Sequence, residues 1–360
     1  MATPLAIKRL DTSRTDMAAC RQLLRHGSRS FYASSLLMPQ PYRDAAVSLY
    51  AFCRLADDAI DLSDAPLEAL QHLRLRLDSI YANDPTDDPA DRMLTKTVRE
   101  FGIPRELLEA LLEGFAWDCT SRRYDTLEDL RAYGARVAGV VGVMMALLMG
   151  ERDYQVLARA ADLGVAMQLT NIARDVGEDA RNGRIYLPMG ALREAGIDSE
   201  SWLRQPVHSE ALATVIEALL READRLYQQA EAGIACLPRG CQPCVMTARL
   251  LYCEIGEEVR RRHYDAISAR AVVSSARKCR VVGGLGRLGS LPREALQAPA
   301  LPETRFLLDA VAAAPLPAAN REEPIGRVEW ILDMFAELQR RDQLARLPNR
   351  DGACPLLIED

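Results

Sequence analysis

Apolar residues recur at every third or fourth position through most of the chain, which is the spacing of one face of an α-helix. The pattern predicts amphipathic helices over residues 42–62, 67–81, 93–101, 104–117, 127–149, 210–234 and 244–270, after a first helix capped by Thr15 or Asp16. The longest apolar run, residues 137–150, is too short to span a bilayer and is expected to be a core helix. Gly139 and Gly142 within it either kink the helix or allow a neighbouring helix to approach closely.

Composition favours an all-α fold. Hydrophobic residues make up 49% of the chain and aromatic residues only 6%, and the apolar residues are mostly Ala, Leu and Val. These residues suit helices better than a β-sandwich. The net charge of −6 speaks against a nucleic-acid partner.

Cysteine usage and the N-terminus predict a cytoplasmic protein. The nine cysteines are scattered, and only Cys241 and Cys244 form a Cys-x-x-Cys pair. Without a second pair at zinc-ribbon spacing, reduced thiols are expected. The N-terminus has no basic segment followed by an apolar one, so we expect no secretory signal.

The chain divides by composition into four expected parts. Residues 1–15 are polar and expected to be flexible, 16–283 form one large helical domain, 284–320 form a Pro- and Ala-rich linker with a short helix near 305–313, and 321–360 hold an amphipathic helix and tail. The apolar stripe of the last part suits packing on the domain, which is the default interpretation, or pairing with another subunit. Because Trp and Arg flank the stripe, it also suits an anionic membrane surface. We expect the tail from about Leu301 to be dispensable for chemistry.

Carboxylate and amide oxygens line one face of a predicted apolar helix. Asn171, Asp175 and Asp179 follow one another at four-residue intervals, so their side chains stack along one face. Buried carboxylates are costly unless they are paired or bind a metal, and oxygen ligands suit Mg²⁺ shared with substrate phosphates. Arg174 and Arg184 are close enough in sequence to bind phosphate oxygens that the metal leaves free.

A second acidic cluster, Asp57, Asp58 and Asp61, follows another apolar helix. Asp57 and Asp61 are four residues apart, and Arg54 lies three residues before Asp57 on the same face. A solvated helix end is the alternative interpretation of such a cluster. Two acidic helices facing each other would line a cavity for a metal-bridged diphosphate.

With these motifs the chain resembles the head-to-head prenyl synthases, the family of squalene and phytoene synthases. The resemblance runs from about residue 20 to about residue 280, and the matching stretches are 26–31, 50–61, 136–142 and 168–188. It implies a single large all-α domain of the isoprenoid-synthase type with a central cavity, followed by a C-terminal helical appendage.

The resemblance also implies roles for individual residues. The acids that it implies to be catalytic are Asp57, Asp61, Asp175 and Asp179, and these four with Asp58 and Asn171 are the implied metal ligands. The implied substrate-binding residues are Ser28, Ser30, Phe31, Tyr50, Arg54, Gln168, Asn171, Arg174, Arg184 and Tyr186. Asp118 and Tyr124 are implied to support the site. From residue type alone, Ser28 and Ser30 could equally cap a helix.

The implied reaction is the first committed step of carotenoid biosynthesis. Two geranylgeranyl diphosphates join head to head through prephytoene diphosphate to 15-cis-phytoene, with release of diphosphate and with Mg²⁺ or Mn²⁺ as cofactor. The block from Gly183 to Pro188 is closer to the phytoene branch, so no NADPH is expected. The alternative is a C30 dehydrosqualene- or squalene-type synthase; a non-catalytic relative is disfavoured because both acidic motifs are intact.

The insoluble product implies peripheral membrane contact, and other carotenoid enzymes are candidate partners.

Overall fold

The computed structural model describes residues 12–27, 35, 38–61, 63, 65–283 and 294–316. The chain separates into two units, residues 1–320 and 321–360, and every described residue belongs to the first. Within the described residues each regular element is a helix and no strand occurs. The predicted all-α fold is therefore confirmed.

The first half of the domain consists of helices that cover one side of the core. They are α1 (Thr12–Gly27), α3 (Gln40–Asp61), α4 (Pro66–Tyr81), α5 (Pro89–Phe101) and α6 (Arg105–Cys119). Local sequence explains their ends: α5 starts after Asp88, whose side chain accepts from the Ala90 amide, and stops at Gly102, which is left-handed with φ 58°.

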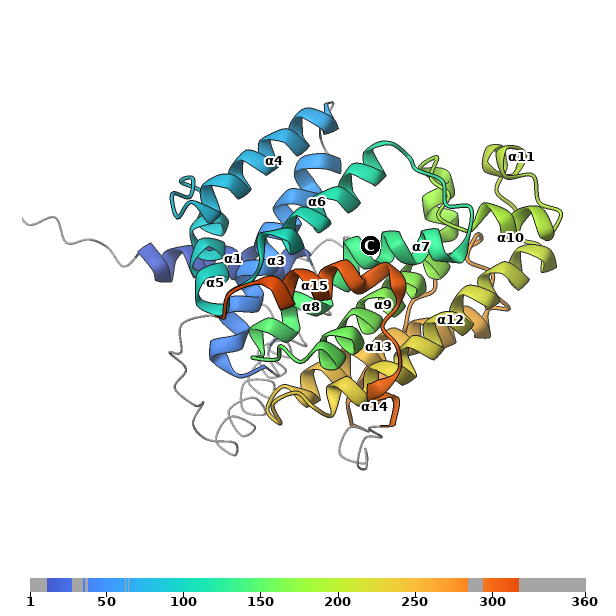
Figure 1. The fold of residues 1–360 in the computed structure, drawn as a ribbon. Coiled ribbons are helices and arrows are strands. Elements are labelled where there is room, and N and C mark those ends of the chain that lie inside the picture. The colour runs from blue at the N-terminus through green and yellow to red at the C-terminus, as the bar shows by residue number, and fades with distance from the viewer. Residues whose placement is uncertain are drawn as a thin grey trace, which may run out of the picture. The chain divides into compact units, whose positions relative to one another are not determined.

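The second half is built around one long helix. Its elements are α7 (Leu127–Gly134), the π-helix η1 (Ala135–Gly139), α8 (Val140–Leu148), α9 (Tyr154–Arg181), α10 (Met189–Glu194), α11 (Ser199–Arg204), α12 (Glu210–Ile234), α13 (Gln242–Arg261) and α14 (Ser275–Gly283). Helix α9 packs against α7, η1, α8, α12 and α13, which places it in the interior of the domain (Figure 1).

Two glycines allow α9 to touch α8 and η1 through their backbones. A methyl group on Gly142 would lie 2.1 Å from the carbonyl oxygen of Ala160, and one on Gly164 would lie 2.2 Å from that of Ala138. Close helix packing is thus what this glycine-rich run provides, with η1 inserted in the same helical stretch.

That stretch, 127–148, is long and apolar enough to cross a membrane, but α8 contributes Val143, Met144 and Leu147 to the core, as expected of a core helix.

Residues 294–316 pack on the domain, although they fall within the range expected to be a linker. They form the 3₁₀ helices η3 (Glu294–Gln297) and η4 (Pro302–Thr304) and the helix α15 (Arg305–Ala313), which matches the predicted short helix. Leu307 and Leu308 of α15 are fully buried. Helix α15 crosses α8 and α9 on their outer side (Figure 1).

Several predicted helix ends differ from the structure; α5, for example, begins at Pro89 and not at residue 93. Helix α1 begins at Thr12, and Asp16 is a buried residue within it that pairs with Arg92 at 2.7 Å, not a cap. Helix α13 ends at Arg261, not at residue 270, because His263 and Tyr264 adopt left-handed backbone angles with φ 53° and 59°. The segment that follows turns back toward α9, with consequences for the site.

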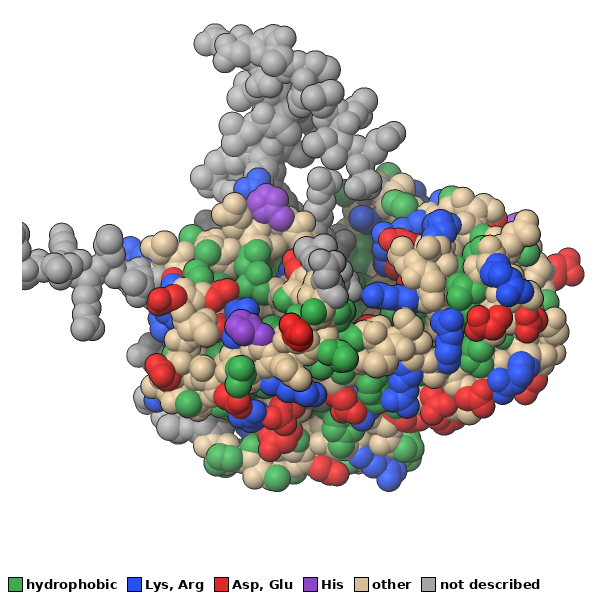
Figure 2. Space-filling model, turned by 90° about the horizontal axis from the view of Figure 1, so that it is seen from above, with side chains coloured by type: hydrophobic (Ala, Val, Ile, Leu, Met, Phe, Trp, Pro, Cys, Tyr) green, Lys and Arg blue, Asp and Glu red, His purple; other side chains and the backbone are tan. Residues whose placement is uncertain are grey.

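The surface carries charges of both signs. Figure 2 shows one face of the domain, on which acidic and basic side chains of the described residues are interspersed with apolar ones. This mixed pattern differs from the basic patch that nucleic-acid-binding surfaces carry.

Candidate functional site

Helix α9 is buried on every side except one. From Leu163 to Ala180 the residues that retain some exposure recur at intervals of one, three and four, so they share a face. They are Met167, Gln168, Asn171, Arg174, Asp175, Glu178 and Asp179. The predicted column of Asn171, Asp175 and Asp179 is therefore the accessible stripe of an otherwise buried helix.

The stripe borders an apolar cavity of about 280 Å³. Helix α9 lines this cavity from Val156 to Asn171, which spans roughly 22 Å at 1.5 Å per residue. The other walls come from η1, α8, α12 and α13, together with Met38 and Ala46, and methionines and small residues predominate in them. Gln168 and Asn171 form the polar end, and Asp175 and Asp179 follow one and two turns further along the helix.

Asn171 presents an unused acceptor to this cavity. Its side-chain oxygen, Oδ1, is buried and has no hydrogen-bond partner among the described residues. A buried amide oxygen without a donor is costly, and a ligand that approaches this atom would remove that cost. A hard cation, a water or a donor on the substrate would each satisfy it.

Asp175 is held by two arginines. Arg174 donates to its carboxylate at 2.7 Å from the same helix, and Arg270 donates at 2.8 Å and 3.2 Å from the segment after α13. That segment approaches closely because residue 177 is glycine: a methyl group there would lie 2.6 Å from the carbonyl oxygen of Ala266. Arg270 was not predicted from the sequence, and only the return of this segment brings it to the site.

Asp179 is partly buried and has two other carboxylates beside it. Burial raises its pKa to about 7, and the neighbouring charges of Asp175 and Glu178 add to this effect. Arg184 opposes it from the turn after α9, where its backbone amide also donates to the carbonyl oxygen of Asp179 at 2.8 Å. Negative charge that is only partly compensated favours the approach of a cation.

Tyrosines surround Asp118 beside this end of α9. Asp118 accepts hydrogen bonds from Tyr133 at 3.0 Å and from Tyr186 at 2.7 Å. The rings of Tyr133 and Tyr186 stack with centroids 5.2 Å apart, and Tyr124 lies 5.3 Å from Tyr133. Burial raises the pKa of Tyr133 far above its usual value, so these hydroxyls remain donors at neutral pH. Asp118 thereby orients Tyr186.

The second acidic motif occupies the C-terminal turn of α3. Arg54 donates to Asp57 at 3.3 Å and to Asp58 at 3.0 Å, and all three are half-buried. Burial raises the pKa of Tyr50, with Arg54 opposing and Asp57 adding to the shift, so this ring lies near the same cluster. Asp61 is the last residue of α3, and its side chain lies outside the described residues, as do Ser28, Ser30 and Phe31.

The donor chemistry fits a hard divalent cation. Among the residues that the structure describes, no three His, Cys, Asp or Glu side chains lie close enough together to hold a metal ion. Mg²⁺ in proteins is commonly bound by one or two carboxylates together with substrate phosphates and waters. Asn171 Oδ1 without a donor and the crowded carboxylate of Asp179 are the oxygens that such a metal–diphosphate unit could use.

Comparisons with known proteins identify the family of this chain. The squalene/phytoene synthase family matches residues 24–277. The phytoene synthase of Cereibacter sphaeroides is 44% identical over 353 residues, covering 93% of this chain and 98% of that protein. The phytoene synthase of Rhodobacter capsulatus is 45% identical, covering 91% and 97%. A solved dehydrosqualene synthase with bound ligand has a TM-score of 0.71 at 30% identity, covering 77% of this chain and 97% of that structure. The chain therefore belongs to the squalene/phytoene synthase family.

Proposed function

We propose that this chain is a phytoene synthase that joins two geranylgeranyl diphosphates head to head. As a member of its family it is an enzyme of the prenyltransferase type. The observation that carries the proposal is the arrangement along α9, where an apolar cavity continues directly into a stripe of oxygen ligands and arginines. A prenyl diphosphate has the same two-part chemistry, and both named relatives above 40% identity are phytoene synthases.

The diphosphate is assigned to the two acidic motifs and their arginines. The residues proposed to hold Mg²⁺ or Mn²⁺ are Asp57, Asp58, Asp61, Asn171, Asp175 and Asp179. A bound divalent ion would neutralise the diphosphate as a Lewis acid and so make it a better leaving group. Arg54, Arg174 and Arg184 would donate to the remaining phosphate oxygens. In the described contacts Arg54 and Arg174 bind the acids, so substrate binding would redistribute these ion pairs.

The cavity is assigned to the prenyl chains and the carbocation. Apolar walls exclude water, which would otherwise capture the cation formed when diphosphate leaves. Tyr50 and Tyr186 are the described aromatic residues proposed to contact substrate, and an aromatic face can stabilise a positive charge. Gln168 lines the polar end of the cavity and is proposed to orient the diphosphate end of the chain. No reductant enters this scheme, because loss of a proton completes the reaction to phytoene.

The proposal also concerns where the protein acts in the cell. A hydrocarbon product has to leave the cavity for an apolar phase, so we propose that the protein is cytoplasmic and contacts the membrane peripherally. The amphipathic stretch within residues 321–360 is the proposed contact, and it lies outside the described residues. Other enzymes that act on carotenoids are further proposed partners.

The test is a product assay with purified protein and Mg²⁺. Radiolabelled C15 and C20 diphosphates are supplied separately, each with and without NADPH. Conversion of the C20 substrate to a C40 hydrocarbon without NADPH is the expected result. A C30 hydrocarbon as the main product would support the dehydrosqualene- or squalene-type alternative, and absence of any hydrocarbon would reject both.

A further inference from the structure

Residues 294–304 form a strap across the outer side of α9 and α12, on the far side of these helices from the acidic stripe. The strap consists of η3, the irregular segment after it and η4. Its apolar side chains join separate parts of the core: Leu296 packs beside Met149 and Val156, Ala300 joins the cluster around α8, and Leu301 joins the cluster around α12. The strap is therefore an integral layer of the domain.

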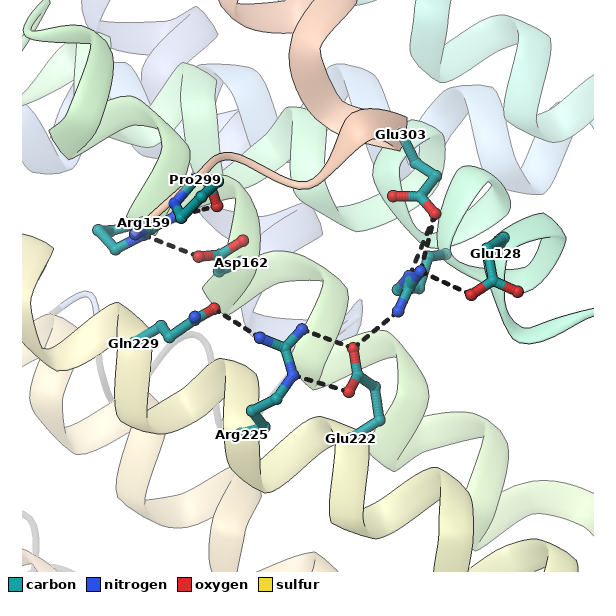
Figure 3. A network of polar contacts seen from close by, with 9 residues as sticks. Glu128, Arg159, Asp162, Glu222, Arg225, Gln229, Pro299 and Glu303 are labelled. Atoms are coloured by element: carbon teal, nitrogen blue, oxygen red, sulfur yellow. Dashed lines mark hydrogen bonds and ion pairs between the residues drawn. The ribbon is translucent and has the colours of Figure 1, made fainter. Parts of the chain in front are cut away.

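Arg159 of α9 holds one end of the strap (Figure 3). Its guanidinium donates to the carbonyl oxygens of Ala295 at 2.8 Å, Ala298 at 2.9 Å and Pro299 at 3.3 Å. Arg159 is only 1% exposed and pairs with Asp162 at 2.8 Å. Irregular backbone needs donors for its carbonyl oxygens, and the planar fork of arginine supplies several in fixed directions.

A second ion-pair group holds the other end of the strap. Arg131 of α7 binds Glu303 of the strap and Glu222 of α12, each at 3.0 Å. Arg225 binds Glu222 at 2.7 Å (Figure 3). Arg131, Glu222 and Glu303 are largely buried. The strap is thus fixed at both ends by charged groups from the helices beneath it.

At the Arg159 end, the strap lies behind the apolar end of the cavity. Met149, Val156 and Leu237 line that end, farthest along α9 from Asn171, and Leu296 packs against the same cluster from outside. The stem of Arg159 passes through the wall beside Gly233, where a methyl group would lie 2.4 Å from the Arg159 Cβ. One residue therefore contributes its stem to the cavity wall and its charge to the strap.

We propose that the strap sets the depth of the cavity and hence the length of prenyl chain that the enzyme accepts. Leu296 is a positioning residue, because it packs against Met149, Val156 and Leu237 from outside the cavity. Arg159 positions the strap that carries Leu296, through its hydrogen bonds to the strap backbone. A buried ion pair adds little net stability compared with apolar packing, but it can fix one arrangement of the groups around it. The inference rests on the proposed function, since the chain that fills the cavity is that of the prenyl diphosphate.

The test compares two leucines of the strap in the full-length protein. Leu296→Ala removes packing from behind the apolar end of the cavity, so a longer chain should fit. We expect kcat/KM for a C25 diphosphate, divided by kcat/KM for the C20 diphosphate, to rise about tenfold. This is the discrimination that one or two methylenes provide. Leu301→Ala removes the same atoms from the strap where it faces the α12 cluster. It should lower Tm to a similar extent and leave the ratio within about twofold of wild type.

Arg159→Lys provides the second measurement. Lysine retains a positive charge beside Asp162 but lacks the fork that binds three carbonyl oxygens. We expect faster amide hydrogen exchange within residues 294–301 and a shift of the C25-to-C20 ratio in the same direction as in Leu296→Ala. Unchanged ratios in Leu296→Ala would overturn the inference even if Arg159→Lys fails to fold. A wild-type protein that does not turn over C20 diphosphate would instead reject the proposed function.

Discussion

Asp175 lies between two cations that come from different parts of the chain. Arg174 is its neighbour on α9, whereas Arg270 arrives from a segment 95 positions later. A carboxylate in this place can exchange an arginine for a metal ion when a diphosphate brings its own negative charge. The same side chain therefore has a partner in the free protein and a ligand role in the proposed complex.

Replacing the proposed ligands should abolish turnover without unfolding the protein. Asp175→Ala or Asp61→Ala is expected to lower kcat/KM by at least about 100-fold, because the diphosphate loses compensation of its charge as it leaves. Glu217→Ala is the control, since this substitution removes the same charge from an exposed position of α12. Steady-state kinetics and circular dichroism measure both effects. More than about a tenth of wild-type activity in Asp175→Ala, a loss below ~1.4 kcal/mol, would count against the metal assignment.

The buried pair of Arg159 and Asp162 should make stability depend on pH. Burial raises the pKa of Asp162 from 3.8 to about 6, although Arg159 opposes the shift. The folded protein therefore holds a proton that the unfolded chain has released between these values, and the resulting stability is lost as pH rises through about 6.

The measurement for this pair is urea unfolding of wild type and Asp162→Asn from pH 4 to 7. The wild-type unfolding free energy should fall relative to the variant by about 1–3 kcal/mol over this range. The comparison cancels the titration of other groups. A constant difference between the two proteins would show that Asp162 titrates as it does in the unfolded chain.

At the level of elements, the contact of α8 with α9 depends on the absence of side chains. Gly142→Ala would place a methyl group 2.1 Å from the Ala160 carbonyl oxygen, which is backbone and cannot rotate away. Forcing these helices apart should cost at least about 2–3 kcal/mol. Gly256→Ala in α13 is the control, because its methyl group would meet the flexible side-chain ends of Leu220 at 3.4 Å and Arg260 at 3.7 Å.

Chemical denaturation at one pH separates these two glycine variants. Gly256→Ala should change the unfolding free energy by no more than about 1 kcal/mol in either direction, the range of helix propensity and ordinary packing. Equal effects of the two substitutions would mean that α8 and α9 can separate without loss.

For the whole molecule, the tail that can be removed is shorter than the sequence predicts, because it does not begin at Leu301. Leu301 is 8% exposed and Leu307 and Leu308 are fully buried, so deletion of residues 301–360 removes part of the core. We expect that truncation to abolish cooperative melting. Deletion of residues 317–360 should retain it, together with turnover in detergent close to that of the full chain.

The same truncation tests the proposed membrane contact. Without residues 317–360 the protein should sediment less with anionic vesicles, because the Trp- and Arg-flanked stripe is absent. Scrambling the order of residues 321–360 is the control, since it retains charge and composition but not the stripe. Equal sedimentation of the full and truncated proteins would end the membrane proposal for this segment.

Features that depend on neighbouring residues were predictable from the sequence, whereas contacts between residues far apart in the chain were not. Helix α12 runs from Glu210 to Ile234, as predicted, because its cap at Ser209 and its apolar period are properties of adjacent residues. The stripe of Asn171, Asp175 and Asp179 was predictable for the same reason, since four-residue spacing places side chains on one face. Helix α13 was predicted too long because its charged C-terminal sequence suits a helix as well as it suits the observed turn.

What the sequence could not predict are contacts between residues far apart in the chain. The approach of Arg270 to Asp175 requires the turn at His263 and the close passage at Gly177, neither of which leaves a local pattern. Residues 294–316 look like a linker by composition, and only their packing on α8, α9 and α12 makes them part of the domain. Hydrophobic period and capping act over one or two turns of helix, whereas the depth of the cavity and the partners of its charges depend on which helices meet. The sequence could therefore establish the helices, the acidic face of α9 and the family resemblance, and the tertiary structure alone decided what lies opposite them.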